Sequence, residues 1–324
     1  MMSGTLGGRY RIIKPLGVGG FGHTFLAEDT HLPGHPPCVI KQLMPQSADP
    51  FFLQTAKRLF DTEAQVLHKL GEHQQIPKLF AHFEENQEFY LVEEFIDGNV
   101  LGEEIKNGQQ WNETQVIKLL LDILIPLAFV HQHQVIHRDL KPANLIRRKQ
   151  DSKIVLIDFG AVKEILSQAT SFHGQSSLTV AIGTPGYAPN EQSNGKPTLS
   201  SDIYAVGIIA IQALTGLHPN QLPDDPSTGE IVWRNHTQVS PKLAEILNKM
   251  VRYDFRQRYQ SAEEALQVVG KLKSRRKVIV SKKLIGVFIT LLLPIVIGVV
   301  IFSRSIDMQQ PKNETLPKKD IPAF

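Results

Sequence analysis

The chain has 324 residues, of which 42% are hydrophobic and 21% charged, so it can build one large or two small buried cores. This composition excludes global disorder, and a formal net charge of +3 is too small to predict nucleic-acid binding across the surface. The single cysteine, Cys38, excludes an intrachain disulfide framework and favours a reducing compartment. The first residues contain no apolar run, so we expect no secretory signal before the folded part.

The predicted elements divide the chain into a strand-rich part and a helix-rich part. Residues 9–41 contain short β-type segments on either side of a glycine cluster, which predicts a hairpin. Apolar spacing predicts a helix around residues 56–70, and a strand pattern returns at residues 89–95. A long buried helix is expected from residue 113, with further helices at 202–214, 241–251 and 261–272. This segregation predicts an α+β protein with a small β lobe and a larger helical lobe.

The glycine cluster at residues 17–22 reads GVGGFG and lies between two strand-like stretches. Small residues there let backbone amides approach phosphate oxygens closely. A dinucleotide-binding fold uses a similar glycine spacing, but its motif must open a helix directly afterwards. Residues 24–27 look extended instead, which favours the hairpin.

A second feature pairs a lysine with a distant glutamate. Lys41 ends the strand-like run that includes Cys38, and Glu63 lies in the helix predicted next. A lysine facing a glutamate across a nucleotide site can hold two phosphates while the carboxylate fixes its ammonium group. Taken alone, the two residues are better explained as a solvated lysine and a surface helix glutamate.

Two further motifs are much more specific. Residues 137–144 read HRDLKPAN, and residues 157–160 read IDFG after a strand-like run. With the two earlier features in the same order, these residues resemble the protein kinase family, in particular bacterial members with eukaryotic-like (Hanks-type) catalytic domains. The resemblance spans roughly residues 10–271. It implies a two-lobed kinase fold, with an N-lobe at about 10–96 and a C-lobe at about 97–271.

The resemblance also implies roles for individual residues. Asp139 would orient the substrate hydroxyl and accept its proton, and Lys141 would contact the γ-phosphate of ATP. Asn144 and Asp158 would bind Mg²⁺, for which Mn²⁺ can substitute. Lys41 would hold the α- and β-phosphates, with Glu63 as its brace. The expected ATP-binding residues are Leu16, Gly17, Gly19, Gly20, Phe21, Gly22, Thr24, Val39, Lys41, Glu63, Glu94 and Ile96.

Residues 183–191 resemble the end of a kinase activation loop, although Asn190 departs from the usual sequence. The expected structural residues are Glu191, Asp202 and Arg258. Glu191 and Arg258 would form an ion pair, and Asp202 would hold the backbone of the loop that carries Asp139. Arg138 resembles the arginine that pairs with a phosphorylated activation loop. The candidate phosphorylation sites, in a polar linker-like stretch that also suits an ordinary flexible loop, are Ser171, Ser176, Ser177 and Thr179.

Three other residues depart from the family pattern around the expected adenine pocket. Glu93 stands where an apolar residue is usual, and an acid there can pair with Lys41 when nucleotide is absent. Thr24 and Val39 alter the roof of the pocket. The resemblance implies a non-specific serine/threonine protein kinase that acts on protein substrates, and we expect it to self-associate for autophosphorylation. The C-terminal residues discussed below predict that it acts in membrane-associated signalling, and the small net charge predicts no nucleic-acid partner. The alternative is a pseudokinase that serves as a nucleotide-gated membrane scaffold.

The C-terminal residues predict a membrane anchor. Residues 284–302 form a run of 19 residues without a charge, which as a helix spans about 28 Å. A buried core helix is the alternative, but the kinase pattern is already complete by residue 271. The basic segment 272–283 predicts that the kinase domain lies in the cytoplasm and the tail 303–324 lies outside, so the chain would be a single-pass cell-membrane protein that contacts lipid through one helix.

Overall fold

A computed structural model describes residues 5–19, 22–44, 50–159 and 184–272 of this chain. The predicted membrane segment, the four candidate phosphorylation sites, Gly20 and Phe21 all lie outside the described residues. The strands are β1 Tyr10–Gly19, β2 Gly22–Asp29, β3 Pro37–Leu43, β4 Leu79–Glu85, β5 Glu88–Glu94, β6 Gly98–Val100, β7 Leu145–Arg148 and β8 Ile154–Leu156. The main helices are α1 Pro50–Leu70, α2 Leu101–Glu104, α3 Glu113–Gln132, α5 Asn190–Ser193, α6 Leu199–Thr215 and α7 Pro241–Met250, and residues 262–272 are also helical.

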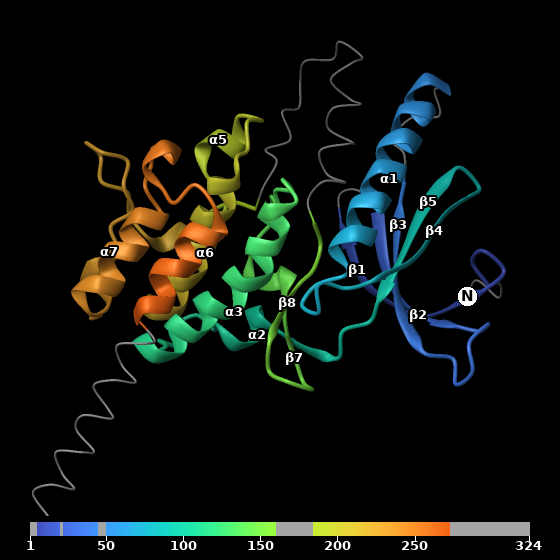
Figure 1. The fold of residues 1–324 in the computed structure, drawn as a ribbon, viewed down its shortest axis with the longest axis horizontal. Helices are drawn as coiled ribbons and strands as arrows, with labels where there is room; N and C mark the ends of the chain where they lie inside the picture. Colours follow the sequence, from blue (N-terminus) through green and yellow to red (C-terminus); the bar gives the residue numbers. More distant parts are fainter. Residues whose placement is uncertain (1–4, 20–21, 45–49, 160–183, 273–324) are drawn as a thin grey trace, which may run out of the picture. The chain divides into compact units, whose positions relative to one another are not determined.

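The N-lobe is a five-stranded antiparallel sheet in the order β1-β2-β3-β5-β4, with α1 lying along it (Figure 1). The two faces of β5 have different neighbours, because successive side chains of a strand alternate between faces. Tyr90 and Val92 join a small core with strands β1 to β3. Phe89 and Leu91 belong to the large core that includes α1 and the C-lobe helices. The face that carries Leu91 is therefore the one directed toward the rest of the kinase-like fold.

The predicted hairpin is confirmed, and one of its glycines has a steric reason. Strands β1 and β2 pair in an antiparallel register that ends at Gly19 opposite Gly22. A Cβ atom added to Gly22 would lie 1.8 Å from the carbonyl oxygen of Gln42 on β3. At Gly17 an added Cβ would meet no atom of the described residues within 4 Å. The two glycines therefore serve different purposes, since packing requires only Gly22.

The C-lobe is built on apolar helices that follow the predicted pattern. Asn112 caps α3 through a capping box with Gln115, which satisfies backbone donors at the helix start. Most of α3 and nearly all of α6 are buried in one continuous core that also contains α7. Among the described helices, α3 is long and apolar enough to span a membrane, and its burial in this core accounts for that composition.

The two lobes are joined by specific contacts as well as by the chain. Gln75, just after α1, donates side-chain hydrogen bonds to the carbonyl oxygens of Asp122 on α3 and Ile154 on β8. The carbonyl oxygen of Gln75 in turn accepts a bond from the Leu156 N–H group. These buried bonds place the small sheet β6-β7-β8 beside the end of α1. Because the segments after β7 and β8 carry the candidate site, this contact positions it.

Candidate active site

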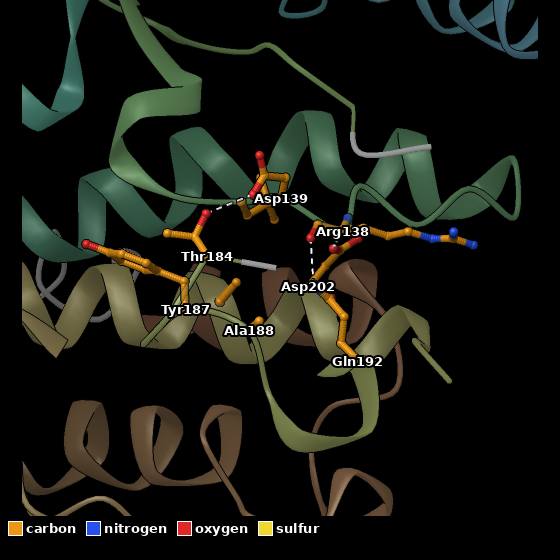
Figure 2. Close-up of a pocket in the computed structure, with 9 residues that line it drawn as sticks. Arg138, Asp139, Thr184, Tyr187, Ala188, Gln192 and Asp202 are labelled. Atoms are coloured by element: carbon orange, nitrogen blue, oxygen red, sulfur yellow. Dashed lines mark hydrogen bonds between the residues drawn. The ribbon is translucent and has the colours of Figure 1, made fainter. Parts of the chain in front are cut away.

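Asp139 lies at the centre of a hydrogen-bonded group in the loop that precedes β7. Its carboxylate is buried and receives bonds from the Asn144 amide nitrogen (2.9 Å) and the Thr184 hydroxyl (3.0 Å). The Lys141 ammonium lies 3.1 Å from the same carboxylate and donates to the Thr184 hydroxyl at 2.9 Å. Figure 2 shows Thr184 directed toward Asp139 across a small pocket. Two charged side chains and one hydroxyl therefore hold each other in a fixed geometry.

Asp202 holds the backbone of the loop that carries Asp139. The Asp202 carboxylate, fully buried at the start of α6, accepts bonds from the backbone N–H groups of His137 (2.8 Å) and Arg138 (2.9 Å). It also accepts a bond from Nε2 of His131 at 3.0 Å. Since the other ring nitrogen of His131 accepts the Ala262 N–H group, Nε2 must carry the proton. The expected contact between Asp202 and the backbone of this loop is present.

Lys41 on β3 contacts two carboxylates of the described residues. Its ammonium lies 2.9 and 2.8 Å from the two oxygens of Glu93 and 2.8 Å from Asp158. Burial alone would lower the pKa of Lys41, but the two carboxylates outweigh that effect and raise it. The pair with Glu93 follows from the register, because Lys41 lies opposite Leu91 and Glu93 is the next residue on the same face.

The expected pair between Lys41 and Glu63 stays a prediction. Glu63 lies buried on α1, and the carboxylates that Lys41 contacts in the described part of the chain are Glu93 and Asp158. The expectation that an acid at position 93 can pair with Lys41 agrees with the observed contact.

Asp158 and Asn144 are brought together by the small C-lobe sheet. The Ile157 N–H group donates to the carbonyl oxygen of Asn144, which fixes the two segments side by side. Asp158 has a positive φ of 58°, an uncommon conformation for a non-glycine residue that is typical of functional sites. Phe159 packs under the loop, with its ring 4.5 Å from that of His137.

Residues 10–269 match the protein kinase domain family. The chain belongs to the protein kinase family. It is 47% identical over 269 residues to serine/threonine-protein kinase B of Synechocystis sp. and 42% identical over 270 residues to serine/threonine-protein kinase PknA of Nostoc sp.. These matches cover 82% and 83% of this chain but only 46% and 48% of the relatives, so the chain spans about half of their length.

Solved structures support the same fold. The kinase domain of Mycobacterium tuberculosis PknI aligns with a TM-score of 0.62 at 22% identity, covering 84% of this chain and 99% of that domain. The apo form of PpkA-294 also gives a TM-score of 0.62 at 22% identity, with 83% and 99% coverage. At this sequence identity the likeness establishes the two-lobed kinase fold alone.

The residues of the kinase domain fit a metal-bound nucleotide. An ammonium, two carboxylates and an amide are the groups that bind phosphates and a hard divalent cation such as Mg²⁺. Lys41 and the backbone near Gly17 would hold phosphates, because among the described residues no atom lies within 4 Å of a Cβ added to that glycine. Asp158 and Asn144 would hold the metal, with Asn144 using its oxygen because its nitrogen is bonded to Asp139.

The other expected nucleotide-binding residues lie on the same strands or just after them. Leu16 on β1 is an exposed apolar side chain, and Thr24 on β2 lies opposite Lys41. Val39 on β3 lies opposite Glu93. Glu94 ends β5, and Ile96 follows it.

The structural ion pair expected in the C-lobe is present. Arg258 is fully buried and contacts both oxygens of Glu191, at 2.6 and 3.3 Å, while Ser201 donates to the same carboxylate. Gln192, next to Glu191, donates to the carbonyl oxygen of Arg138 at 2.6 Å. In Figure 2 the Arg138 side chain extends away from Asp139, which leaves its backbone as the part that contacts the pocket.

Sequence reasoning assigned no role to Thr184 or His131. Thr184 lies far along the chain from Asp139, in the segment 183–191 that resembles the end of an activation loop. His131 reads in sequence as one residue of an apolar helix. The available signal was that a polar residue stands in an apolar helix (His131) or in a turn segment (Thr184). Only the folded structure shows the partners of these two residues.

Proposed function

We propose that this chain is an ATP-dependent serine/threonine protein kinase, as the names of its relatives suggest. The observation that carries the proposal is the group of Asp139, Lys141, Thr184 and Asn144 beside Asp158 and Lys41. Such a site supplies a proton acceptor and positive charge where phosphoryl transfer needs them.

Each residue has a distinct part in the proposed reaction. The Asp139 carboxylate accepts the proton of the substrate hydroxyl and orients its oxygen for attack. Lys141 and Lys41 place positive charge beside the phosphate oxygens, on which charge accumulates in the transition state. When bound, the metal ion neutralises phosphate charge, and Asp158 and Asn144 are the residues that would hold it. Thr184 keeps Asp139 and Lys141 in register.

The activity is tested on the purified chain with labelled ATP, Mg²⁺ and a generic protein substrate. We expect phosphate transfer to serine or threonine, and Asp139→Asn should reduce it by several orders of magnitude. Asp225→Asn is a matched control, because Asp225 lies in an exposed turn and bonds to Ser227 and Thr228. Equal transfer by the wild type and Asp139→Asn would refute the assignment.

A pseudokinase scaffold is the alternative. It is favoured by one observation, the double contact of Lys41 with Glu93 and Asp158, because the expected phosphate-binding lysine is already paired with carboxylates. Its sign would be nucleotide binding without turnover. We favour the active enzyme because Lys41, Asp139, Asn144 and Asp158 are all present.

The proposal includes attachment to the cell membrane through residues 284–302. The uncharged run and the basic segment before it support a single span with the kinase domain in the cytoplasm. Anchored copies would meet laterally, which would favour autophosphorylation within the segment that contains Ser171 and Thr179. Full-length protein that is released from membranes by an alkaline wash would contradict the anchor.

A further inference from the structure

The N–H donors of the Lys41 ammonium group are directed at carboxylates in this structure. An ammonium group has three such donors. Two face the two oxygens of Glu93, at 2.9 and 2.8 Å, and the third faces Asp158 at 2.8 Å. A phosphate that binds Lys41 must therefore displace at least one carboxylate, so the strength of nucleotide binding depends on what each displacement costs.

Displacement of Asp158 costs little. Its side chain is 46% exposed in the segment that follows β8, so water can solvate the released carboxylate. The same carboxylate is one of the groups that would hold the metal ion bound with the nucleotide. Exchange of Asp158 for a phosphate therefore leaves no charge without a partner.

Displacement of Glu93 costs much more. Its side chain is 8% exposed, and it lies on β5, which pairs with β3 on one side and with β4 on the other. Among the described residues, Lys41 is the cation that contacts it. A buried carboxylate that loses its cation keeps the cost of desolvation and gains no interaction in return. If Glu93 instead keeps its contact with Lys41, its negative charge lies beside the incoming phosphate and repels it.

We propose that Glu93 competes with ATP for Lys41 and thereby lowers the affinity of this kinase domain for the nucleotide. Glu93 holds Lys41 within the sheet until ATP and Mg²⁺ bind. The lysine then moves to the phosphates, and its expected pair with Glu63 can form. This inference rests on the proposed function, because it assigns phosphate binding to Lys41.

The competition gives Glu93 a regulatory consequence. The apolar residue that is usual at this position in the family has no charge with which to hold Lys41. The carboxylate therefore raises the ATP concentration at which the site is half saturated. Activity would follow changes in ATP concentration over a range in which a domain with an apolar residue at position 93 would already be saturated.

The first test measures the binding of ATP with Mg²⁺ to the purified chain by calorimetry. Glu93→Met removes the competing carboxylate and should lower Kd for ATP about tenfold. Glu93→Gln keeps the shape of the side chain but not its charge, and should lower Kd by a smaller factor. The matched control Glu84→Met should leave Kd unchanged, because Glu84 pairs with Lys57 in an exposed contact between β4 and α1. An unchanged or higher Kd in Glu93→Met, or in Glu93→Gln if the methionine variant does not fold, would overturn the inference.

Adenosine separates competition for Lys41 from packing against the base. Glu93 stands at the back of the expected adenine pocket, so a methionine there could also contact the adenine ring. Adenosine has no phosphates, and its Kd should therefore be unchanged in Glu93→Met. A gain for adenosine as large as the gain for ATP would show that the effect comes from packing and would overturn the inference.

The second test asks whether the effect passes through Lys41. A double variant, Lys41→Met with Glu93→Met, should bind ATP no better than Lys41→Met alone. It should also recover most of the thermal midpoint that Lys41→Met loses, because Glu93 is no longer buried without a cation. A gain in ATP affinity as large as in the wild-type background, or losses of stability that simply add, would overturn the inference.

Failure of the inference can be distinguished from failure of the proposed function, because binding is measured without phosphate transfer. If the wild type binds ATP but transfers no phosphate, the function fails and the Kd values still decide the role of Glu93. If the wild type does not bind ATP, binding by Glu93→Met supports the inference, and no binding by either protein overturns it.

Discussion

Thr184→Val removes one hydroxyl from the group around Asp139 and changes little else. Valine has nearly the same shape as threonine, so the backbone and the pocket should keep their form. The substitution removes the bond from Thr184 to Asp139 (3.0 Å) and the bond from Lys141 to Thr184 (2.9 Å). Asp139 and Lys141 remain 3.1 Å apart, so each charged side chain keeps the other as its ion-pair partner.

The expected loss can be estimated from these contacts. A hydrogen bond to a charged group contributes about 1.5–3 kcal/mol. If one such bond orients Asp139 in the transition state, its loss lowers kcat about 10- to 150-fold. KM for ATP should change little, because Lys41 and Asp158 are untouched.

The assay is steady-state phosphate transfer at saturating ATP, with a thermal melt of each variant. Thr184→Ser keeps the hydroxyl and should restore most of kcat. A Thr184→Val protein with wild-type kcat would refute the positioning role of the hydroxyl. A serine variant as inactive as the valine variant would show that the methyl group, not the hydroxyl, is required.

Three other predictions concern stability and pH. Glu191→Gln leaves the buried Arg258 cation without its counterion and should destabilise the protein by about 3 kcal/mol in urea unfolding, whereas Asp254→Asn, in an exposed pair with Arg256, should change stability little. Gly22→Ala should destabilise the hairpin because its Cβ would strike Gln42, whereas Gly17→Ala should keep the melting temperature but raise KM for ATP; equal melting temperatures for both would contradict the steric argument. Burial lowers the pKa of His137 in the folded protein. Below about pH 6.5 the unfolded chain therefore binds a proton at this residue that the folded protein does not bind. The free energy of unfolding should then fall with decreasing pH by at most about 1.4 kcal/mol per pH unit from this group. His137→Phe should flatten that part of the profile, and an unchanged slope between pH 5 and 7 would exclude His137 as its source.

Much of the fold was predictable because the spacing of hydrophobic residues within one helix or strand indicates that element without knowledge of its neighbours. Helices predicted at 202–214 and 241–251 correspond to α6 Leu199–Thr215 and α7 Pro241–Met250. The helix predicted around 56–70 begins earlier, at Pro50, because proline is tolerated in the first turn of a helix. Such boundary errors arise where local signals are weak.

The contacts of the candidate site were less predictable, because they join segments far apart in the chain. The pairs between Lys41 and Glu93 and between Thr184 and Asp139 depend on strand register and on loop packing. The resemblance assigned the brace of Lys41 to Glu63, and the sequence marked Glu93 as an unusual acid that can pair with Lys41 when nucleotide is absent. Which carboxylate contacts Lys41 depends on the positions of β5 and α1 in three dimensions.

The two halves of the candidate site are held by different scaffolds. Asp139 is fixed from the C-lobe, where Asp202 binds the loop backbone and is itself oriented by His131. Lys41 is fixed from the N-lobe sheet by Glu93. The contact between Lys41 and Asp158 is the charged link between them, and a bound nucleotide would replace it with phosphate and metal contacts. Nucleotide bound at the proposed site would therefore replace one link between the two halves with another, so that their alignment would depend on the ligand that is to react.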